Sequence, residues 1–381
     1  MSRTKPRRRP RAPAVLLLAA AAMVLFGFVM LFSTSLPHAE RMFGNPYHFV
    51  SHQSVWLVAG LFVCFVCARV DYRLFASPPF FWTLFGGCTL LLALCYVPVV
   101  GMPSHGAYRW IGLPHTHFRF QPSELAKLVF ILFCARHFAA FKGIWPGYGK
   151  GLFLPAAILL VPLLLVAAEK DLGTAMLLSA TTGILFLLAG LPFYLVVLGF
   201  LAVASGLAVV VWYDPERISR VLAFADLKTH EAGDAYQLLN ALYAFVAGGF
   251  SGLGLGQGIQ KQLYLPEAHT DFIFATIAEE LGIVASLGVV ALFLVFLFAG
   301  FRIAARTPDP FGKLIAYGIS SCISLQAIMN IAVVTGSMPT KGIALPFISY
   351  GGSSLLVMLA MTGILLSIAR HSEADAAGAE L

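Results

Sequence analysis

The chain has 381 residues, of which 59% are hydrophobic and only 11% are charged. Soluble globular domains carry about 25% charged residues, so this composition excludes an ordinary soluble enzyme. The net charge of +7 could indicate nucleic-acid binding, but the basic residues lie in short gaps between apolar stretches, so we expect no nucleic-acid partner.

Apolar stretches of the length needed to cross a hydrocarbon layer of about 30 Å predict about ten transmembrane helices. Their ranges are 13–34, 52–70, 80–100, 122–141, 151–168, 172–190, 193–212, 272–300, 312–336 and 347–369. The first stretch is longer than the core of a signal peptide, so we interpret it as a retained anchor. We therefore predict an all-α polytopic integral membrane protein, with a basic segment at 1–12, one transmembrane domain at 13–370 and a tail at 371–381.

The distribution of Lys and Arg predicts the orientation of the chain. If the N-terminus is cytoplasmic, 15 of these residues lie on the inner side and five lie in the short outer loops. Both termini are then cytoplasmic, and the long connection at about 213–271, between the seventh and eighth spans, is extracytoplasmic.

The long connection contains two unusual stretches. Residues 236–250 are rich in apolar side chains, so we expect them at the interface or dipping into the protein. Residues 248–258 are dense in glycine, but no Gly-Lys-Ser/Thr follows and no βαβ unit surrounds them, which argues against a phosphate-binding loop. We expect flexible or closely packed backbone there.

Ionisable side chains open two of the predicted spans. Glu124 and Lys127, three residues apart at the start of the fourth span, can pair on one helical face. This pair can fix helix packing, form a charged wall of a substrate cavity, or do both. Asp171 opens the sixth span, where it can cap the helix or lie near its positive end.

The eighth span opens with a carboxylate beside a histidine. Thr270 or Asp271 could simply cap the helix, but Asp271 next to His269 is also well placed for proton transfer at the membrane boundary. Partial desolvation would raise the pKa of Asp271 toward the range of a general base. Glu279 and Glu280, deeper in the span, are too costly to face lipid and should face protein.

The segment before the last span, residues 338–354, contains two prolines, paired glycines and several hydroxyls, including Ser349. This pattern predicts a broken or re-entrant backbone, which is tolerated at membrane depth only against protein or water. We therefore expect the segment to line a cavity, with Lys341 as one of its cations. Arg109, before the fourth span, adds another external cation.

The predicted topology places six of these charges at one membrane level: Arg109, Glu124, Lys127, Asp171, Asp271 and Lys341. Cations suit a phosphate head group, and carboxylates suit a base or a metal ion. No nucleotide motif accompanies them. The site therefore suggests a substrate that arrives within the membrane already activated.

Several long motifs occur in an order that resembles the SEDS family (shape, elongation, division and sporulation), whose members include FtsW and RodA. They are GAYRWI at 106–111, QPSELAK at 121–127, DLGT at 171–174, LYLPEAHTDFIF at 263–274, EELG at 279–282 and the block at 339–354. The resemblance covers nearly the whole chain after the basic segment. Residues 265–271 and 339–342 are more similar to FtsW, the division member, than to RodA, the elongation member.

The resemblance implies a peptidoglycan glycosyltransferase that polymerises lipid II, with Asp271 as the catalytic candidate. The expected reaction joins the 4-hydroxyl of an acceptor GlcNAc to C1 of a donor MurNAc, inverts the linkage and releases undecaprenyl pyrophosphate. Asp271 would be the general base or, alternatively, a ligand for Mg or Mn. Judged only from their charge and their predicted side of the membrane, Arg109, Lys127 and Lys341 are candidates for binding the phosphates. Glu124, Asp171, His269 and Ser349 are candidates for supporting roles.

The resemblance also implies a class B penicillin-binding protein and other divisome proteins as partners, in the bacterial inner membrane at the division site. One departure is visible, because Lys170 stands where the family commonly has proline before the aspartate at 171. Two alternatives stay open: a flippase that moves lipid II outward, and a non-catalytic scaffold that recruits a transpeptidase.

Overall fold

The structure is a computed structural model that describes residues 11–98, 100–104, 107–112, 119–141, 147–226, 235–262 and 264–378. The predicted basic segment therefore lies almost wholly outside the described residues. The helices are α1 (Arg11–Phe43), α2 (His48–Arg69), η1 (Tyr72–Ala76), α3 (Pro78–Leu94), α4 (Pro122–Ala139), η2 (Gly149–Phe153), α5 (Leu154–Ala168), α6 (Leu172–Leu188), α7 (Phe193–Trp212), α8 (Pro215–Ala225), α9 (Tyr236–Gly248), α10 (Ile273–Arg306), α11 (Pro310–Val334) and α12 (Gly352–Gly378).

Each of the ten predicted spans overlaps a helix, namely α1 to α7 and α10 to α12, although several of the predicted limits differ from the observed ones. Seven helices in the described ranges are long and apolar enough to cross a bilayer, and α3 and α6 are shorter apolar helices. The polytopic helical fold is confirmed, whereas the number of crossings stays a prediction.

The last helix departs from its predicted limits at both ends. It begins at Gly352 rather than 347, because the preceding residues form the predicted non-helical segment. It then continues to Gly378 and so includes most of the predicted tail. The Ala and Glu residues after position 372 are strong helix formers, so nothing in that stretch ends the helix.

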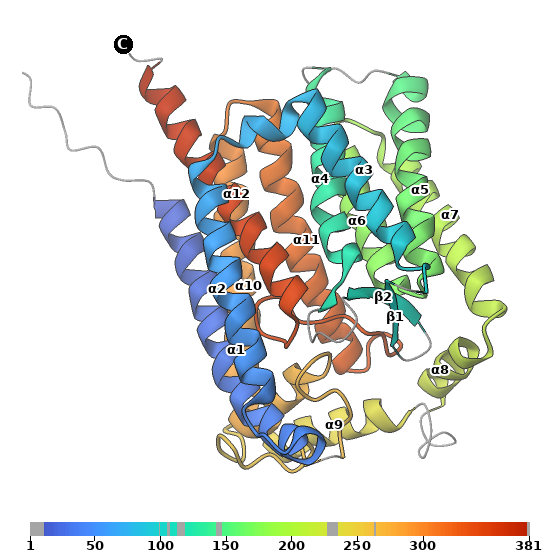
Figure 1. The fold of residues 1–381 in the computed structure, drawn as a ribbon, viewed down its shortest axis with the longest axis vertical. Helices are drawn as coiled ribbons and strands as arrows, with labels where there is room; N and C mark the ends of the chain where they lie inside the picture. The colour runs from blue at the N-terminus through green and yellow to red at the C-terminus, as the bar shows by residue number, and fades with distance from the viewer. Residues whose placement is uncertain are drawn as a thin grey trace, which may run out of the picture.

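A small antiparallel sheet was not part of the all-helical prediction. It consists of β1 (Gly101–Ser104), β2 (Ala107–Gly112) and β3 (Arg119–Phe120), in the order β1-β2-β3. Its register pairs Gly101 with Ile111 and Ile111 with Phe120. The sheet lies beside the start of α4, so it carries Arg109 of β2 to that end of the bundle (Figure 1).

Helices α4 and α11 form the centre of the bundle, with most of their side chains buried, whereas no described side chain of α7 is buried. The start of α1 and the end of α12 lie at one end of the molecule, and α8, α9 and the sheet lie toward the other (Figure 1). The side of the membrane on which each terminus lies stays a prediction.

The glycine-dense stretch packs closely against α10. Of the two predicted alternatives, flexible or closely packed backbone, the second is therefore confirmed. Helix α10 is interrupted at Gly282, whose φ is +76°. The break exposes backbone groups that bond to the stretch instead: Leu253 N donates to Glu279 O at 2.9 Å, and Ile283 N donates to Gly249 O at 3.0 Å. A side chain at Gly248 or Gly252 would overlap the α10 backbone, so glycine is required for this approach.

Glu279 and Glu280 both face protein, as predicted, and both are fully buried. Glu279 accepts hydrogen bonds from the backbone nitrogens of Ile259 and Gln260 at 2.8 and 3.1 Å. Glu280 pairs with Lys261 at 2.6 Å and accepts a hydrogen bond from Ser33 at 2.7 Å. The two carboxylates therefore hold the glycine-dense stretch and α1 against α10.

Replacing Lys261 with methionine should lower the free energy of unfolding by about 3–5 kcal/mol, because Glu280 would keep a buried charge without its partner. Thermal unfolding of the purified protein in detergent measures this loss. The matched control is Lys170→Met, which removes an exposed pair with Asp214 at 3.5 Å and should cost less than about 1 kcal/mol. Equal losses in the two variants would contradict a structural role for the buried pair.

Candidate functional site

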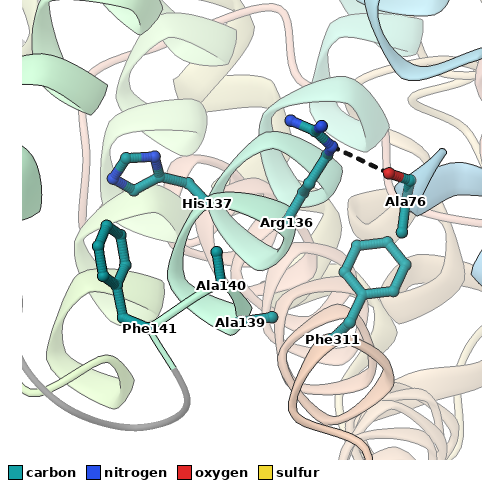
Figure 2. A pocket seen from close by; sticks show the side chains of 7 residues that line it. All are labelled: Ala76, Arg136, His137, Ala139, Ala140, Phe141 and Phe311. Atoms are coloured by element: carbon teal, nitrogen blue, oxygen red, sulfur yellow. Dashed lines mark hydrogen bonds between the residues drawn. The ribbon is translucent and has the colours of Figure 1, made fainter. Parts of the chain in front are cut away.

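A cavity of about 680 Å³ lies where β2, the start of α4 and the segments before α10 and α12 meet. Six of the eight predicted site residues line it: Arg109, Glu124, Lys127, His269, Asp271 and Lys341. A second cavity, of about 400 Å³, lies at the opposite end of α4 and contains none of the eight (Figure 2). There Arg136 donates to the Ala76 carbonyl at 3.0 Å. The larger cavity is therefore the candidate site.

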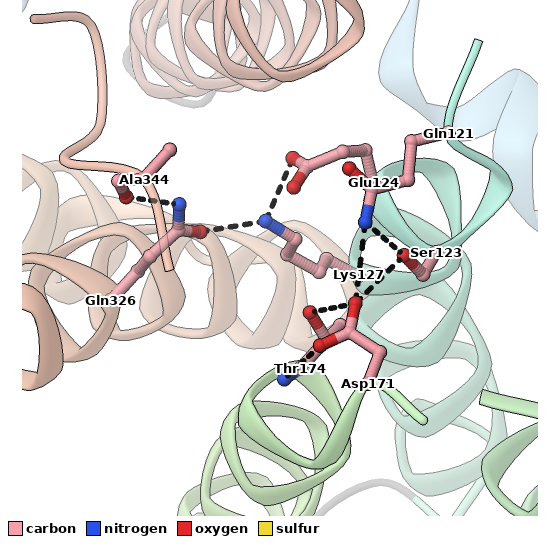
Figure 3. Close-up of polar contacts among 8 residues, drawn as sticks. All are labelled: Gln121, Ser123, Glu124, Lys127, Asp171, Thr174, Gln326 and Ala344. Atoms are coloured by element: carbon pink, nitrogen blue, oxygen red, sulfur yellow. Dashed lines mark hydrogen bonds and ion pairs between the residues drawn. The ribbon is translucent and has the colours of Figure 1, made fainter. Parts of the chain in front are cut away.

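Glu124 and Lys127 fulfil both predicted roles, because the pair lines the cavity and also fixes the packing of two helices. Their charged groups are 2.7 Å apart and buried. Lys127 also donates to Gln326 of α11 at 2.6 Å, and Gln326 donates to the Ala344 carbonyl at 2.8 Å (Figure 3). Since its charge is neutralised by Glu124, Lys127 is a poor candidate for binding phosphate.

Asp171 caps α6, which confirms one of its two predicted structural roles. Its carboxylate accepts hydrogen bonds from the Thr174 backbone nitrogen at 3.1 Å and from the Thr174 hydroxyl at 2.9 Å. Gln121 and Ser123 at the start of α4 also donate to it, at 3.2 and 3.4 Å (Figure 3). The aspartate joins α4 to α6 just outside the cavity lining. Lys170, which precedes this aspartate, adopts φ +63°, a conformation that proline cannot adopt.

Arg109 and Lys341 line the cavity, and no described carboxylate forms an ion pair with either of them. Arg109 donates to the backbone carbonyls of Glu169 and Lys170 at 3.3 and 2.5 Å, and Lys341 donates to the Met176 sulfur at 2.7 Å. Burial raises the pKa of the Glu169 carboxyl to about 8, so this group is mostly neutral at pH 7 and adds little negative charge beside Arg109. Two cations without a described carboxylate partner are suited to an anionic ligand.

The Asp271 side chain does not cap α10, so the capping interpretation was wrong. The helix follows Phe272, and no side chain caps it. Burial raises the pKa of Asp271 to about 7; the charge of Glu267 adds to the rise and Arg109 opposes it. A carboxyl group with this pKa is partly ionised at neutral pH and can accept a proton there.

Three consecutive carbonyl groups hold the backbone of this segment. The His269 carbonyl accepts from Tyr350 N at 3.0 Å, the Thr270 carbonyl from the Ser349 hydroxyl at 2.6 Å, and the Asp271 carbonyl from Asn330 Nδ2 at 2.7 Å. Ser349 is therefore buried beneath the site rather than directed at a ligand, which agrees with a supporting role.

Asn330 was missed by the sequence reasoning. Its buried amide group, on α11, donates both to Asp271 O and to Ile343 O, the latter at 2.6 Å. It therefore joins the segment before α10 to the segment that carries Lys341. The available signal was a pair of amides, Gln326 and Asn330, one helical turn apart in a largely apolar helix.

His269 packs among aromatic rings, with centroids 4.5 Å from Phe49, 5.3 Å from His38 and 5.8 Å from Tyr350. Burial lowers its pKa to about 4, so the imidazole is neutral at pH 7. No described hydrogen bond joins its ring to Asp271. The described contacts therefore give His269 no direct part in proton transfer at Asp271.

The site can supply few ligands to a divalent cation. Across the described ranges, no three His, Cys, Asp or Glu side chains converge in a way that could hold a metal. Magnesium often takes only one or two protein carboxylates, with water and phosphate oxygens completing its octahedron. Asp271 and the nearby Glu267 could supply those two.

The sequence matches the FtsW/RodA/SpoVE family of cell cycle proteins over residues 13–374. It is 40% identical to the probable peptidoglycan glycosyltransferase FtsW of Geobacter sulfurreducens, over 94% of this chain and 95% of the relative. A chain from a peptidoglycan synthase complex that coordinates polymerization and crosslinking has a TM-score of 0.76 and 30% identity, covering 94% of this chain and 97% of that one. The rod shape determining protein RodA of Thermus thermophilus has a TM-score of 0.68 and 29% identity, covering 93% and 95%. The relatives' names agree with the expected glycosyltransferase activity, and the chain belongs to the FtsW/RodA/SpoVE family.

Proposed function

We propose that this chain is a peptidoglycan glycosyltransferase that polymerises lipid II at the outer face of the inner membrane during division. The observation that carries the proposal is one partly ionised carboxyl group, Asp271, beside two uncompensated cations in a cavity at one end of the bundle. The family relation supports the activity, and the identity with an FtsW relative supports the division role.

The residues divide the work according to their charge. Arg109 and Lys341 bind the pyrophosphate of the donor and stabilise the negative charge that grows on it as it leaves. Asp271 takes the proton from the acceptor 4-hydroxyl while that oxygen bonds to C1 of the donor and the bond from C1 to the pyrophosphate oxygen breaks. Alternatively, Asp271 and Glu267 would hold a divalent cation that neutralises the pyrophosphate, and Asp271 would then be a ligand rather than the base.

The geometry favours catalysis over the two alternatives. A flippase needs a polar path across the membrane. The deeper carboxylates do not offer one, because Glu279 accepts hydrogen bonds from backbone amides and Glu280 pairs with Lys261. A non-catalytic scaffold gives no reason for a cavity that holds a carboxyl group with a pKa near 7.

A single-span class B penicillin-binding protein, with other divisome proteins, is the proposed partner. The similarity to a chain of a peptidoglycan synthase complex supports such a pairing. The chain is a multi-pass inner-membrane protein. Both termini are proposed to be cytoplasmic, which places the Asp271 cavity on the outer side, where lipid II and the transpeptidase domain of the partner are expected.

Asp271→Asn should lower lipid II polymerisation by about 10²–10⁴-fold, because the amide cannot accept the proton. The assay follows glycan strands made by the purified protein with its partner. Full polymerisation by the variant would remove Asp271 from the proposed role. Movement of labelled lipid II across liposomes without polymer would instead support the flippase.

The rate should rise with pH and level off above about pH 7, because Asp271 must be deprotonated to act as base. Two substitutions should shift the rising limb of the pH–rate profile in opposite directions. Glu267→Gln removes a charge that raises the pKa of Asp271, so the limb moves to lower pH. Arg109→Gln removes a charge that lowers it, so the limb moves to higher pH. Profiles of kcat/KM against pH decide the matter, and a shift of both variants in one direction would contradict the assignment.

Asn330→Asp should lower kcat by about 100-fold with KM largely retained, because the side chain loses the two hydrogen bonds that position Asp271 and the Lys341 segment. The matched control is Asn240→Asp on α9. Asn240 is also buried, but its amide bonds only to Tyr236 of its own helix. Steady-state kinetics on folded protein, with the melting temperature of each variant, separates positioning from stability. Equal kcat losses in both variants would contradict the positioning role.

A further inference from the structure

The candidate cavity has two unlike walls. One wall contains the uncompensated cations Arg109 and Lys341. Another is contributed by the end of α1 and the first turns of α2 and consists of the rings of Phe43, His48, His52 and Trp56, which we call the aromatic wall. The mechanism above uses the cations but assigns nothing to the aromatic wall.

The rings of the aromatic wall are fixed in place by the protein. Phe43 stacks on His48 with ring centroids 3.8 Å apart and planes 10° apart. The His48 and His52 centroids are 4.3 Å apart, and His52 Nδ1 bonds to the His48 carbonyl at 2.9 Å. Because a carbonyl can only accept, this nitrogen carries the proton, and the ring orientation is set before any ligand binds.

Trp56 is held by the backbone at the start of α12. A side chain at Gly352 would overlap its indole ring, so glycine at that position lets the ring lie against the main chain. Gln53, one turn earlier on α2, accepts a hydrogen bond from Gly351 N at 3.2 Å. The same contact region therefore positions α2 against the segment that carries Lys341.

The segment before α10 runs between the two walls. His269 lies on the aromatic side, packed against Phe49 and Tyr350. Two residues later, Asp271 lies on the cationic side, where a side-chain carbon added at Gly342 would be 3.2 Å from its carboxylate and 3.7 Å from Arg109 Nη1. Asp271 therefore lies close to Arg109, two residues along the chain from the histidine that packs among the rings.

We propose that the aromatic wall is a saccharide subsite, which binds the N-acetylated sugar rings while the cations hold the pyrophosphate; the proposal rests on the proposed function. The C–H face of a pyranose is apolar and slightly positive, so it suits the negative face of an aromatic ring. A lipid-linked sugar phosphate has both chemistries, joined at the bond that reacts.

Calorimetric titration of the full-length protein in nanodiscs with chitotetraose tests the subsite without turnover, since this soluble β-1,4-linked N-acetylglucosamine tetramer lacks phosphate. The wild type should bind it saturably. Trp56→Ala should weaken binding by about tenfold, while Trp56→Phe, which keeps a ring, should stay near wild type. The matched control is Trp82→Ala, which removes an exposed indole of α3 outside the cavity lining and should bind as the wild type does. Absence of binding by the wild type, or unchanged binding by Trp56→Ala, would overturn the proposal.

Three further measurements separate this proposal from the proposed function. Inorganic pyrophosphate should lose affinity for the Lys341→Gln variant but not for Trp56→Ala, and the reverse pattern would overturn the assignment of the walls. With lipid II, Trp56→Ala should raise KM or shorten the glycan strands. Asp271→Asn should abolish turnover yet still bind chitotetraose. If the wild type binds the saccharide but makes no polymer, the proposed polymerase function is wrong and the proposed saccharide subsite is retained.

Discussion

The hydrogen bonding of irregular backbone inside an apolar bundle constrains the rest of this structure. Non-helical segments precede α10 and α12, and their carbonyls need donors because lipid and apolar side chains offer none. Tyr350, Ser349 and Asn330 supply one donor each to three consecutive carbonyls, at residues 269–271. The donors that satisfy this requirement also place the Asp271 carboxyl group at the cavity.

The charges of the site differ because their partners differ. Lys127 is neutralised at 2.7 Å by Glu124, whereas the hydrogen bonds of Arg109 and Lys341 within the described part of the chain go to carbonyls and a thioether. Asp271 lies between opposing influences, since burial and Glu267 raise its pKa and Arg109 lowers it. A carboxyl group close to half ionisation, beside free cations, is the combination that a proton-accepting glycosyl transfer from a phosphate ester requires.

Much of the site could be predicted, because charges within apolar spans are rare and costly. Arg109, Glu124, Lys127, His269, Asp271 and Lys341 line one cavity as expected. Asn330 and the aromatic wall were missed, since an amide or a ring in an apolar helix is also ordinary packing. The small sheet was missed because the short strands of residues 101–120 carry too little alternation to predict strands.

The bundle of apolar helices, the concentration of charged groups at one end and the non-helical segment before α12 all follow from the sequence alone. Hydropathy and loop charge are local properties of the chain, so they report the membrane environment directly. Only the tertiary structure decided that Asp271 is not a cap, that Lys127 is neutralised and that Glu280 bonds to Ser33, 247 residues away. Such partnerships join segments whose local patterns are independent of one another, so their geometry exists only once the helices have packed.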